Sequence, residues 1–286
     1  MLRIALPNKG RLYEDTRELL ADAGLSLRAA GDRALRATLG GEYEALFVRA
    51  QDVPEFVADG AADVGITGLD QLGESGRPLV DRLDLGFGRC RLVVATREDG
   101  PVREIADVTS GMRVATSFPR LTQQAFERLG RQVQVVPMSG AVEIAPHLGV
   151  ADVVVDLVST GSTLRVNGLR EVGTLLESTA RLMAPAVAHE ASREAPLQRL
   201  QNVLASVVRA RGKRYLMANV PRVALDDVKR VLPGISGPTV VDVLNGGALV
   251  AVHAVVPAEG LDRVIEALQG VGATGILVTR IERLVP

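Results

Sequence analysis

The chain has 286 residues, 47% of them hydrophobic and 23% charged, which is the composition of a soluble globular protein with one large or two to three smaller domains. Its 33 lysines and arginines balance 34 acidic residues, and only 3% of the residues are aromatic, which argues against a dedicated nucleic-acid binder. No apolar run reaches the length of a membrane span, and the N-terminus lacks a signal-peptide layout. With one cysteine, Cys90, and no Cys/His cluster, we expect a cytoplasmic protein without an internal disulfide or a zinc site.

The N-terminal segment is predicted to form a strand, a turn and a helix. The strand covers 2–6, and the helix runs from about 13 to 23 and stops at Gly24. Lys9 and Arg11 lie in the turn, just past the end of the strand, where positive charge can meet an anionic ligand. On the residues alone, two solvated loop cations are an equally good interpretation.

A β-hairpin follows, and the chain then enters a helix. Strands at 34–39 and 43–48 are predicted to pair across a Gly-Gly turn, and Pro54 lies near the first turn of the helix. Arg49 lies directly after the second strand and could reach a phosphate. A surface ion pair with Asp52 is the alternative, which the spacing alone slightly favours.

One phrase of the sequence occurs twice. Gly60-Ala-Ala-Asp63-Val and Gly149-Val-Ala-Asp152-Val each precede an aliphatic strand, so Asp63 and Asp152 are predicted to be structural connectors. The repeat predicts two α/β lobes of similar plan, whose strand ends face a shared cleft. This plan resembles the two-lobed architecture of periplasmic binding proteins. In the first lobe, the strand ends in a turn whose residues would face the cleft: Thr67, Gly68 and Asp70.

The second lobe is predicted to contain further strands and a helix with a polar start. These elements are strands at 90–95, 113–116 and 132–136 and a helix from about 118 to 130. Ser117 and Arg120 lie at the helix start, where backbone N–H groups favour a phosphate. Cys90 lies between two arginines, but a buried small hydrophobe is a better interpretation than a reactive thiol.

The most informative stretch runs from Glu143 to Leu164. An apolar run at 153–158, typical of a buried parallel strand, contains one carboxylate, Asp156, and leads into a turn rich in hydroxyls at 159–163. Backbone N–H groups and hydroxyls in such a turn suit a phosphate, and the acid before it can accept hydrogen bonds from ribose hydroxyls. Ordinary turn chemistry, with Asp156 as a helix cap, is the alternative. A carboxylate in an apolar strand end is costly without a partner, which favours the binding role.

This stretch resembles the signature of the ATP phosphoribosyltransferase family. The matching positions are Glu143, Gly149, Ala151, Asp156, Leu157, Thr160, Gly161, Thr163 and Leu164. The segments at 7–12 and 49–54 are also similar to the family. The resemblance implies condensation of ATP with phosphoribosyl pyrophosphate, the opening step of histidine biosynthesis, with Mg²⁺ carried by the pyrophosphate rather than by dedicated protein ligands.

The resemblance also implies roles for individual residues. Asp156 and Glu143 would be catalytic, although an acid in the first turn of a predicted helix at Glu143 also has a good structural explanation. The residues implied for phosphoribosyl pyrophosphate are Asp156, Ser159, Thr160, Gly161, Ser162 and Thr163. Those implied for ATP are Lys9, Arg11, Arg49, Thr67, Gly68, Asp70, Ser117 and Arg120.

The C-terminal region is predicted to form a β-α-β-β-α-β module of the ferredoxin-like plan. Its predicted elements are strands at 214–220, 239–244, 248–256 and 275–282, helices at 222–231 and 261–268, and a hairpin turn at Asn245-Gly246-Gly247. The module resembles the ACT-like regulatory domain of the long form of the family, which binds histidine as a feedback inhibitor. The best-matching positions are Asn219, Pro238, Thr239 and Ala273. A module used only for oligomer contacts is the alternative.

The predicted organisation is therefore one lobe at 1–88 and 177–210, a second lobe at 89–176 and a regulatory module at 211–286. The stretch at 185–209 is predicted to be helical, with an interruption at Pro196. The family implies a homohexamer in equilibrium with dimers. The histidines, which lack ligand-spaced partners, are predicted to be structural: His147, His189 and His253. A non-catalytic solute-binding or sensor protein is the second hypothesis.

Overall fold

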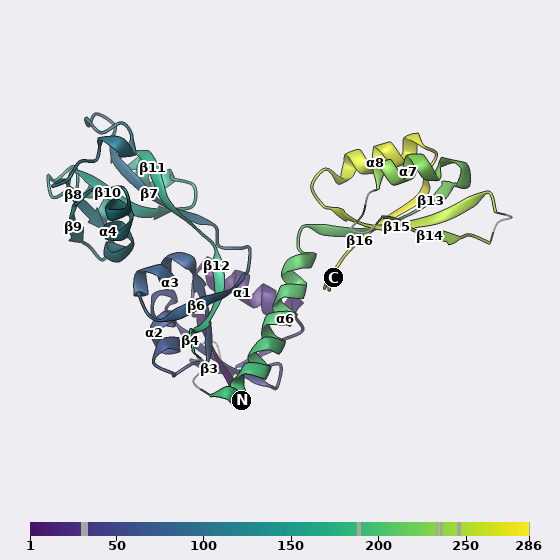
Figure 1. Cartoon of the computed structure of the whole chain (residues 1–286), viewed down its shortest axis with the longest axis horizontal. Helices are drawn as coiled ribbons and strands as arrows, with labels where there is room; N and C mark the ends of the chain where they lie inside the picture. Colours follow the sequence, from purple (N-terminus) through teal and green to yellow (C-terminus); the bar gives the residue numbers. More distant parts are fainter. Residues whose placement is uncertain (30–33, 188–189, 233, 235–236, 245–246, 286) are drawn as a thin grey trace. The chain divides into compact units, whose positions relative to one another are not determined.

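A computed structural model of the chain describes residues 1–29, 34–187, 190–232, 234, 237–244 and 247–285. These residues fold into two compact units, Met1–Gln201 and Asn202–Pro286, and the boundary falls within helix α6 (Glu194–Ala210) (Figure 1). His189 and the first two residues of the predicted turn at Asn245-Gly246-Gly247 lie outside the described residues. Within the described ranges, no helix is long and apolar enough to cross a membrane.

The first unit contains two sheets, and the first of them has seven strands in the order β2-β3-β4-β1-β5-β12-β6. Its strands are β1 (Leu2–Pro7), β2 (Leu27–Ala29), β3 (Arg36–Leu39), β4 (Tyr43–Val48), β5 (Val64–Gly68), β6 (Leu79–Asp84) and β12 (Ala180–Pro185). Its helices are α1 (Arg11–Asp22), α2 (Val53–Ala58) and α3 (Leu69–Ser75), with a 3-10 turn η1 at Ala50–Asp52. Strand β1 is parallel to β4 and β5, so the carboxyl ends of these three strands lie at one edge. The sheet with its helices is the first lobe.

The second sheet has five strands in the order β11-β7-β10-β8-β9, and with its helices it is the second lobe. Its strands are β7 (Cys90–Arg97), β8 (Arg113–Thr116), β9 (Gln134–Pro137), β10 (Val153–Val158) and β11 (Leu169–Ser178). Its helices are α4 (Pro119–Arg128) and α5 (Ser162–Val166), with 3-10 turns η2 (Ile105–Asp107) and η3 (Val142–Ile144). Strand β10 is parallel to β8 but antiparallel to β7, so the prediction of a purely parallel strand is half correct.

The duplicated phrase forms the same connector in both lobes, which confirms its predicted structural role. In the first lobe, Asp63 accepts the backbone N–H of Arg3 (2.7 Å), donates its own N–H to the Arg3 carbonyl (2.9 Å), and the Arg3 guanidinium reaches Gly60 O (2.8 Å). In the second lobe, Asp152 and Arg113 repeat the same bonds at 2.8, 2.9 and 2.9 Å, with Gly149 O as the last acceptor. Each connector joins the start of a strand to the turn that leads into its parallel neighbour.

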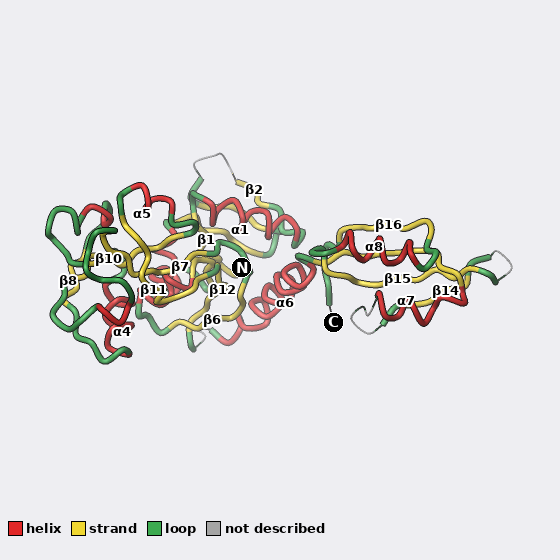
Figure 2. The backbone as a smooth tube through the Cα atoms, turned by 90° about the horizontal axis from the view of Figure 1, so that it is seen from above, coloured by secondary structure: helices red, strands yellow, loops and turns green. Residues whose placement is uncertain are grey.

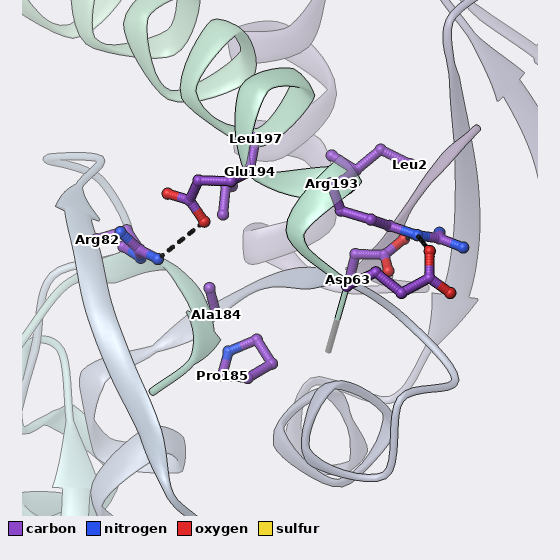
Figure 3. Close-up of a pocket in the computed structure, with 9 residues that line it drawn as sticks. Leu2, Asp63, Arg82, Ala184, Pro185, Arg193, Glu194 and Leu197 are labelled. Atoms are coloured by element: carbon purple, nitrogen blue, oxygen red, sulfur yellow. Dashed lines mark hydrogen bonds and ion pairs between the residues drawn. The ribbon is translucent and has the colours of Figure 1, made fainter. Parts of the chain in front are cut away.

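The first-lobe connector has one more partner. Arg193, in the 3-10 turn η4 (Ala191–Arg193) before α6, donates to the Asp63 carboxylate at 2.7 Å, as Figure 3 shows. Glu194, the first residue of α6, lies 3.6 Å from Arg82 in the same view. The Asp63 side chain is 9% exposed, whereas that of Asp152 is 40% exposed. The start of α6 is therefore fixed to the first sheet through Asp63.

These two connectors predict unequal costs for the same substitution. We expect Asp63→Ala to destabilise the protein by about 2–3 kcal/mol, because two N–H donors, Arg3 N and Arg193 Nη1, lose their acceptor in a partly buried place. The matched variant Asp152→Ala is expected to cost about 1 kcal/mol, because water replaces much of what its exposed carboxylate provides. Urea unfolding of both variants measures the difference, and equal losses would contradict the burial argument.

The second unit is a four-stranded antiparallel sheet in the order β14-β15-β13-β16, which confirms the ferredoxin-like plan. Its elements are β13 (Lys213–Pro221), a 3-10 turn η5 (Arg222–Ala224), α7 (Leu225–Val231), β14 (Thr239–Asp242), β15 (Leu249–Pro257), α8 (Leu261–Gly270) and β16 (Thr274–Arg280). Helix α8 runs alongside β15 and β16 (Figure 2). Alternate residues of β13 and β15 pack with Val228 of α7 and Leu268 of α8 in one core.

Two predictions of secondary structure are wrong. The sequence predicts that 185–209 is helical with an interruption at Pro196, but β12 extends to Pro185 and α6 begins only at Glu194. Pro196 therefore lies in the first turn of α6, where proline is tolerated, and does not interrupt the helix. The helix expected around Glu143 is a single 3-10 turn, which ends before Pro146. Strand β12 is almost fully buried, and a short apolar run of this kind cannot be distinguished from a helix by periodicity.

Candidate active site

A cavity of about 440 Å³, here called the interlobe cavity, lies between the two lobes of the first unit. Lys9 and Arg11, from the turn between β1 and α1, line one side together with Gly68 and Asp70, which follow β5. Ser159, directly after β10, lines the other side. The remaining lining residues are Gly10, Leu12, Ala50, Gln71, Gly88, Arg89, Cys90, Leu157 and Val158. Of the cations predicted for the nucleotide, the cavity lining contains Lys9 and Arg11, near the end of the strand that carries the hydroxyl turn, but neither Arg49 nor Arg120.

The hydroxyl turn itself is at the surface. Ser159, Thr160, Ser162 and Thr163 are exposed, and Gly161 has φ 71°, a left-handed conformation that caps the start of α5. Thr160 Oγ1 lies 3.1 Å from Ser162 Oγ, so both hydroxyls point to one place. A turn of this shape offers hydroxyls and backbone N–H groups to an incoming anion.

Two charged side chains support the turn from behind. The Arg165 guanidinium donates to the Thr160 carbonyl at 3.2 Å. The Glu171 carboxylate lies so close to Gly161 that a Cβ added there would overlap Glu171 Oε1, and Glu171 is itself held by Arg91 at 2.9 Å. Sequence reasoning missed Glu171 and Arg91, because they reach the turn from neighbouring strands rather than from nearby positions.

Asp156 is half-buried in β10, and its carboxylate accepts the backbone N–H of Leu157 at 2.8 Å. Burial raises the pKa of Asp156, and the negative charge of Glu143 raises that pKa further, against the opposing effect of the Leu157 hydrogen bond. The structure therefore brings Glu143 and Asp156 close enough to interact. Both lie outside the lining of the interlobe cavity, as do Thr160, Gly161, Ser162 and Thr163, which continue from Ser159 along the surface.

Gly68 and Asp70 form one unit after β5. Asp70 is only 4% exposed, and its carboxylate accepts the Ser178 hydroxyl at 2.6 Å and the Gln71 side-chain N–H at 2.8 Å. A Cβ at Gly68 would overlap Asp70 Oδ1, so the carboxylate needs a glycine there. Thr67 is fully buried and donates to the Ala50 carbonyl at 2.8 Å, which gives its hydroxyl a structural partner.

The N-terminus of α4 holds a protein carboxylate. Glu74, from α3 of the first lobe, accepts the backbone N–H groups of Arg120 (3.0 Å) and Leu121 (2.9 Å). Two of the N–H groups expected for a phosphate are thus occupied, and the part of Ser117 and Arg120 in nucleotide binding stays a prediction. Arg49 is exposed, and among the described residues it forms no ion pair with Asp52.

Cys90 begins β7 beside Ser178 of β11 and lines the interlobe cavity. Burial raises the pKa of the Cys90 thiol, and the charge of Asp70 raises it further. A reactive thiol requires the opposite shift. The cysteine therefore has the character of a partly buried, uncharged side chain.

In the second unit, the residues predicted for histidine separate into two groups. Asn219 on β13 pairs with Thr274 at the start of β16, so it lies near Ala273. Thr239, next to Pro238, is on β14 at the opposite edge of the sheet. Strand β15 lies between β13 and β14, so two strand spacings, about 10 Å, separate the strand of Asn219 from that of Thr239.

Comparison with known proteins identifies the family. A family model described as ATP phosphoribosyltransferase matches residues 49–207, and one described as HisG, C-terminal domain, matches residues 210–283. Proteins named ATP phosphoribosyltransferase from Gemmatimonas aurantiaca and Natronomonas pharaonis are 63% and 52% identical to this chain, each over the full length of both chains. A solved structure of the ATP phosphoribosyl transferase (HisG:HisZ) complex from Thermotoga maritima matches 72% of this chain and 99% of its own, with 30% identity and a TM-score of 0.59. The chain belongs to the ATP phosphoribosyltransferase family.

Proposed function

We propose that the chain condenses ATP with phosphoribosyl pyrophosphate, which yields N1-(5-phosphoribosyl)-ATP and pyrophosphate, and that histidine inhibits this first step of its own biosynthesis. One observation carries the proposal beyond family membership. An exposed hydroxyl turn follows the buried strand β10, and cations from the first lobe lie across the interlobe cavity from its first residue, Ser159. Two anionic substrates need this combination of groups.

The chemistry follows from these groups. The adenine nitrogen N1 attacks the anomeric carbon while the bond from that carbon to pyrophosphate breaks, and the electron pair leaves with the pyrophosphate. No protein nucleophile is required, so positioning and charge stabilisation supply the rate. In the proposed arrangement, Asp156 accepts the ribose hydroxyls, the turn at 159–163 holds the 5-phosphate, and Lys9, Arg11 and Arg49 offset the charge of the phosphates of ATP.

Mg²⁺ is proposed to bind with the pyrophosphate. The residues present fit this ion, because Asp156 on β10 precedes the hydroxyl turn and the charge of Glu143 acts on it, and Mg²⁺ is usually held by one or two carboxylates together with substrate phosphates. A cation there would also relieve the repulsion that Glu143 exerts on Asp156. When bound, the ion would neutralise charge on the departing pyrophosphate.

An assay of pyrophosphate release tests the function directly. The proposal expects release only when ATP, phosphoribosyl pyrophosphate and Mg²⁺ are all present. Binding of phosphoribosyl pyrophosphate without turnover in the presence of ATP would contradict it and favour a non-catalytic binding protein.

Sheet membership supports the proposed lobe boundaries. Strand β12 returns the chain to the first sheet, in agreement with a first lobe at 1–88 and 177–210 and a second lobe at 89–176. The regulatory module would then begin at 211. The histidine site at Asn219, Pro238, Thr239 and Ala273 and the homohexamer are proposed from family membership.

Histidine inhibition gives a prediction for the second unit. Asn219→Ala is expected to raise the histidine concentration for half-inhibition about tenfold or more, because a hydrogen bond to the inhibitor is lost, while the uninhibited rate is kept. Lys229→Ala, at an exposed position of helix α7, is the control and should leave inhibition unchanged. Parent-like inhibition of the Asn219 variant would place the inhibitor site elsewhere.

A further inference from the structure

The two chain crossings between the lobes meet at one buried group of side chains. The chain leaves the first lobe at β6 and enters the second at Cys90, and it returns from β11 at Ser178 to β12. Cys90 and Ser178 are register partners, and Asp70 contacts Ser178 from the β5–α3 turn. We call these three residues the crossing cluster.

Ser178 and Asp70 hold each other by two hydrogen bonds. The Ser178 hydroxyl donates to Asp70 Oδ1 at 2.6 Å, and the Asp70 backbone N–H donates to Ser178 Oγ at 3.1 Å. The two residues are 2% and 4% exposed, so water does not compete for these bonds. The next residues add a backbone bond from Leu69 N–H to the Thr179 carbonyl at 3.0 Å.

The orientation of the Asp70 carboxylate is fixed on all sides. Ser178 holds Oδ1, the Gln71 side chain holds Oδ2 at 2.8 Å, and Gly68 leaves room for the carboxylate by having no Cβ. Asp70 is one of the residues that line the interlobe cavity, together with Lys9 and Arg11. A carboxylate at the wall of a substrate site acts on the substrate most strongly when its orientation is fixed in advance.

We propose that Ser178 is a positioning residue for the transfer reaction: it fixes the Asp70 carboxylate in the interlobe cavity and ties that carboxylate to the strand by which the chain returns between the lobes. The inference rests on the proposed function, because it takes the interlobe cavity as the substrate site. A displacement of Ser178, where the chain returns from β11 to β12, would then also displace the Asp70 carboxylate. Ser178 itself touches no substrate in this scheme.

Ser178→Ala is the first test. The parent enzyme is expected to release pyrophosphate, and the variant is expected to lose about 10- to 100-fold in kcat, the effect of one lost hydrogen bond to a charged group. Ser206→Ala is the matched control, since Ser206 is also a buried serine (3% exposed) whose hydroxyl donates to a backbone carbonyl, that of Val203, at 2.7 Å. We expect Ser206→Ala to lower thermal stability to a similar extent and to leave kcat and both KM values unchanged.

A double-mutant cycle separates positioning from a general structural effect. In an Asp70→Asn background, adding Ser178→Ala should change kcat by less than about threefold, because Ser178 acts through the missing charge. Ser178→Thr keeps the hydroxyl and should recover most of the activity, since Ser178 borders a second cavity of about 420 Å³ that has room for a methyl group. This variant keeps the test decisive if Ser178→Ala does not fold.

The outcomes are distinguishable. Additive losses in the cycle, or a Ser178→Ala variant that behaves like Ser206→Ala, would overturn the positioning role while the parent still turns over. A parent enzyme that releases no pyrophosphate would instead contradict the proposed function itself.

Discussion

Replacing Asp156 with alanine is expected to weaken the binding of phosphoribosyl pyrophosphate by about 10- to 100-fold, because a carboxylate that accepts ribose hydrogen bonds is removed. Thr163→Ala should also weaken binding, because a hydroxyl proposed to donate to the 5-phosphate is removed. Isothermal titration with phosphoribosyl pyrophosphate and Mg²⁺ measures both. Asp152→Ala, four residues upstream, is the control and should bind like the parent, since Asp152 serves only the connector. If both Asp156→Ala and Thr163→Ala bind phosphoribosyl pyrophosphate as tightly as the parent, the substrate does not bind at this turn.

The Asp156 carboxylate, which is expected to favour substrate binding, is expected to lower the stability of the folded protein at neutral pH. Burial raises the pKa of Asp156 in the folded protein above its ordinary value of 3.8, so folding favours the protonated form. Stability from this group is therefore fully present below pH 3.8 and is lost as the pH rises through the raised pKa. At neutral pH we expect Asp156→Asn to unfold at a higher temperature than the parent, and the difference should vanish in acid. A lower melting temperature at pH 7 would show that the ionised carboxylate is stabilised in the fold.

Gly161→Ala is expected to raise the KM for phosphoribosyl pyrophosphate by about tenfold or more, because the added Cβ would collide with Glu171 and displace the hydroxyl turn. Gly149→Ala is a matched control: its φ of 68° is nearly the same as the 71° of Gly161, but nothing lies within 4 Å of its Cβ. Both variants should lose roughly 1 kcal/mol of stability from backbone strain.

Removing the Glu171 carboxylate provides the second control. Glu171→Ala combined with Gly161→Ala should restore a KM close to that of Glu171→Ala alone, because the colliding carboxylate is gone. If Gly149→Ala raises the KM as much as Gly161→Ala, backbone strain is responsible and the contact with Glu171 is irrelevant. If the double variant is no better than Gly161→Ala, the collision is not the cause.

The features that could be predicted from the sequence are those determined by residues close together in the chain. The hydroxyl turn after β10, the connectors at Asp63 and Asp152 and the β-α-β-β-α-β order are all local patterns, because spacing and residue type decide them within one or two elements. The resemblance to a known family added the identity of the reaction, which no pattern of hydroxyls and cations could supply.

The features that it did not reveal depend on distant partners. Ser178 and Asp70 are 108 positions apart, and the Glu74 carboxylate reaches α4 from 46 positions upstream, so neither contact leaves a trace in local periodicity. Strand β12 is hidden for a different reason. It is buried on both faces and lacks the alternation of a half-buried strand, so its apolar run fits a helix equally well.

The extra ion pair at Asp63 gives the first lobe a property that the second lacks. Asp63 ties the root of α6, through Arg193, to the entrance of β5, and five residues further on that strand delivers Gly68 and Asp70 to the cavity. A displacement of the start of α6 is therefore transmitted through Asp63 to the backbone segment that carries two residues of the cavity wall. Among the described residues of the second lobe, Asp152 contacts no residue equivalent to Arg193, and the matching strand β10 supports its hydroxyl turn from within its own sheet.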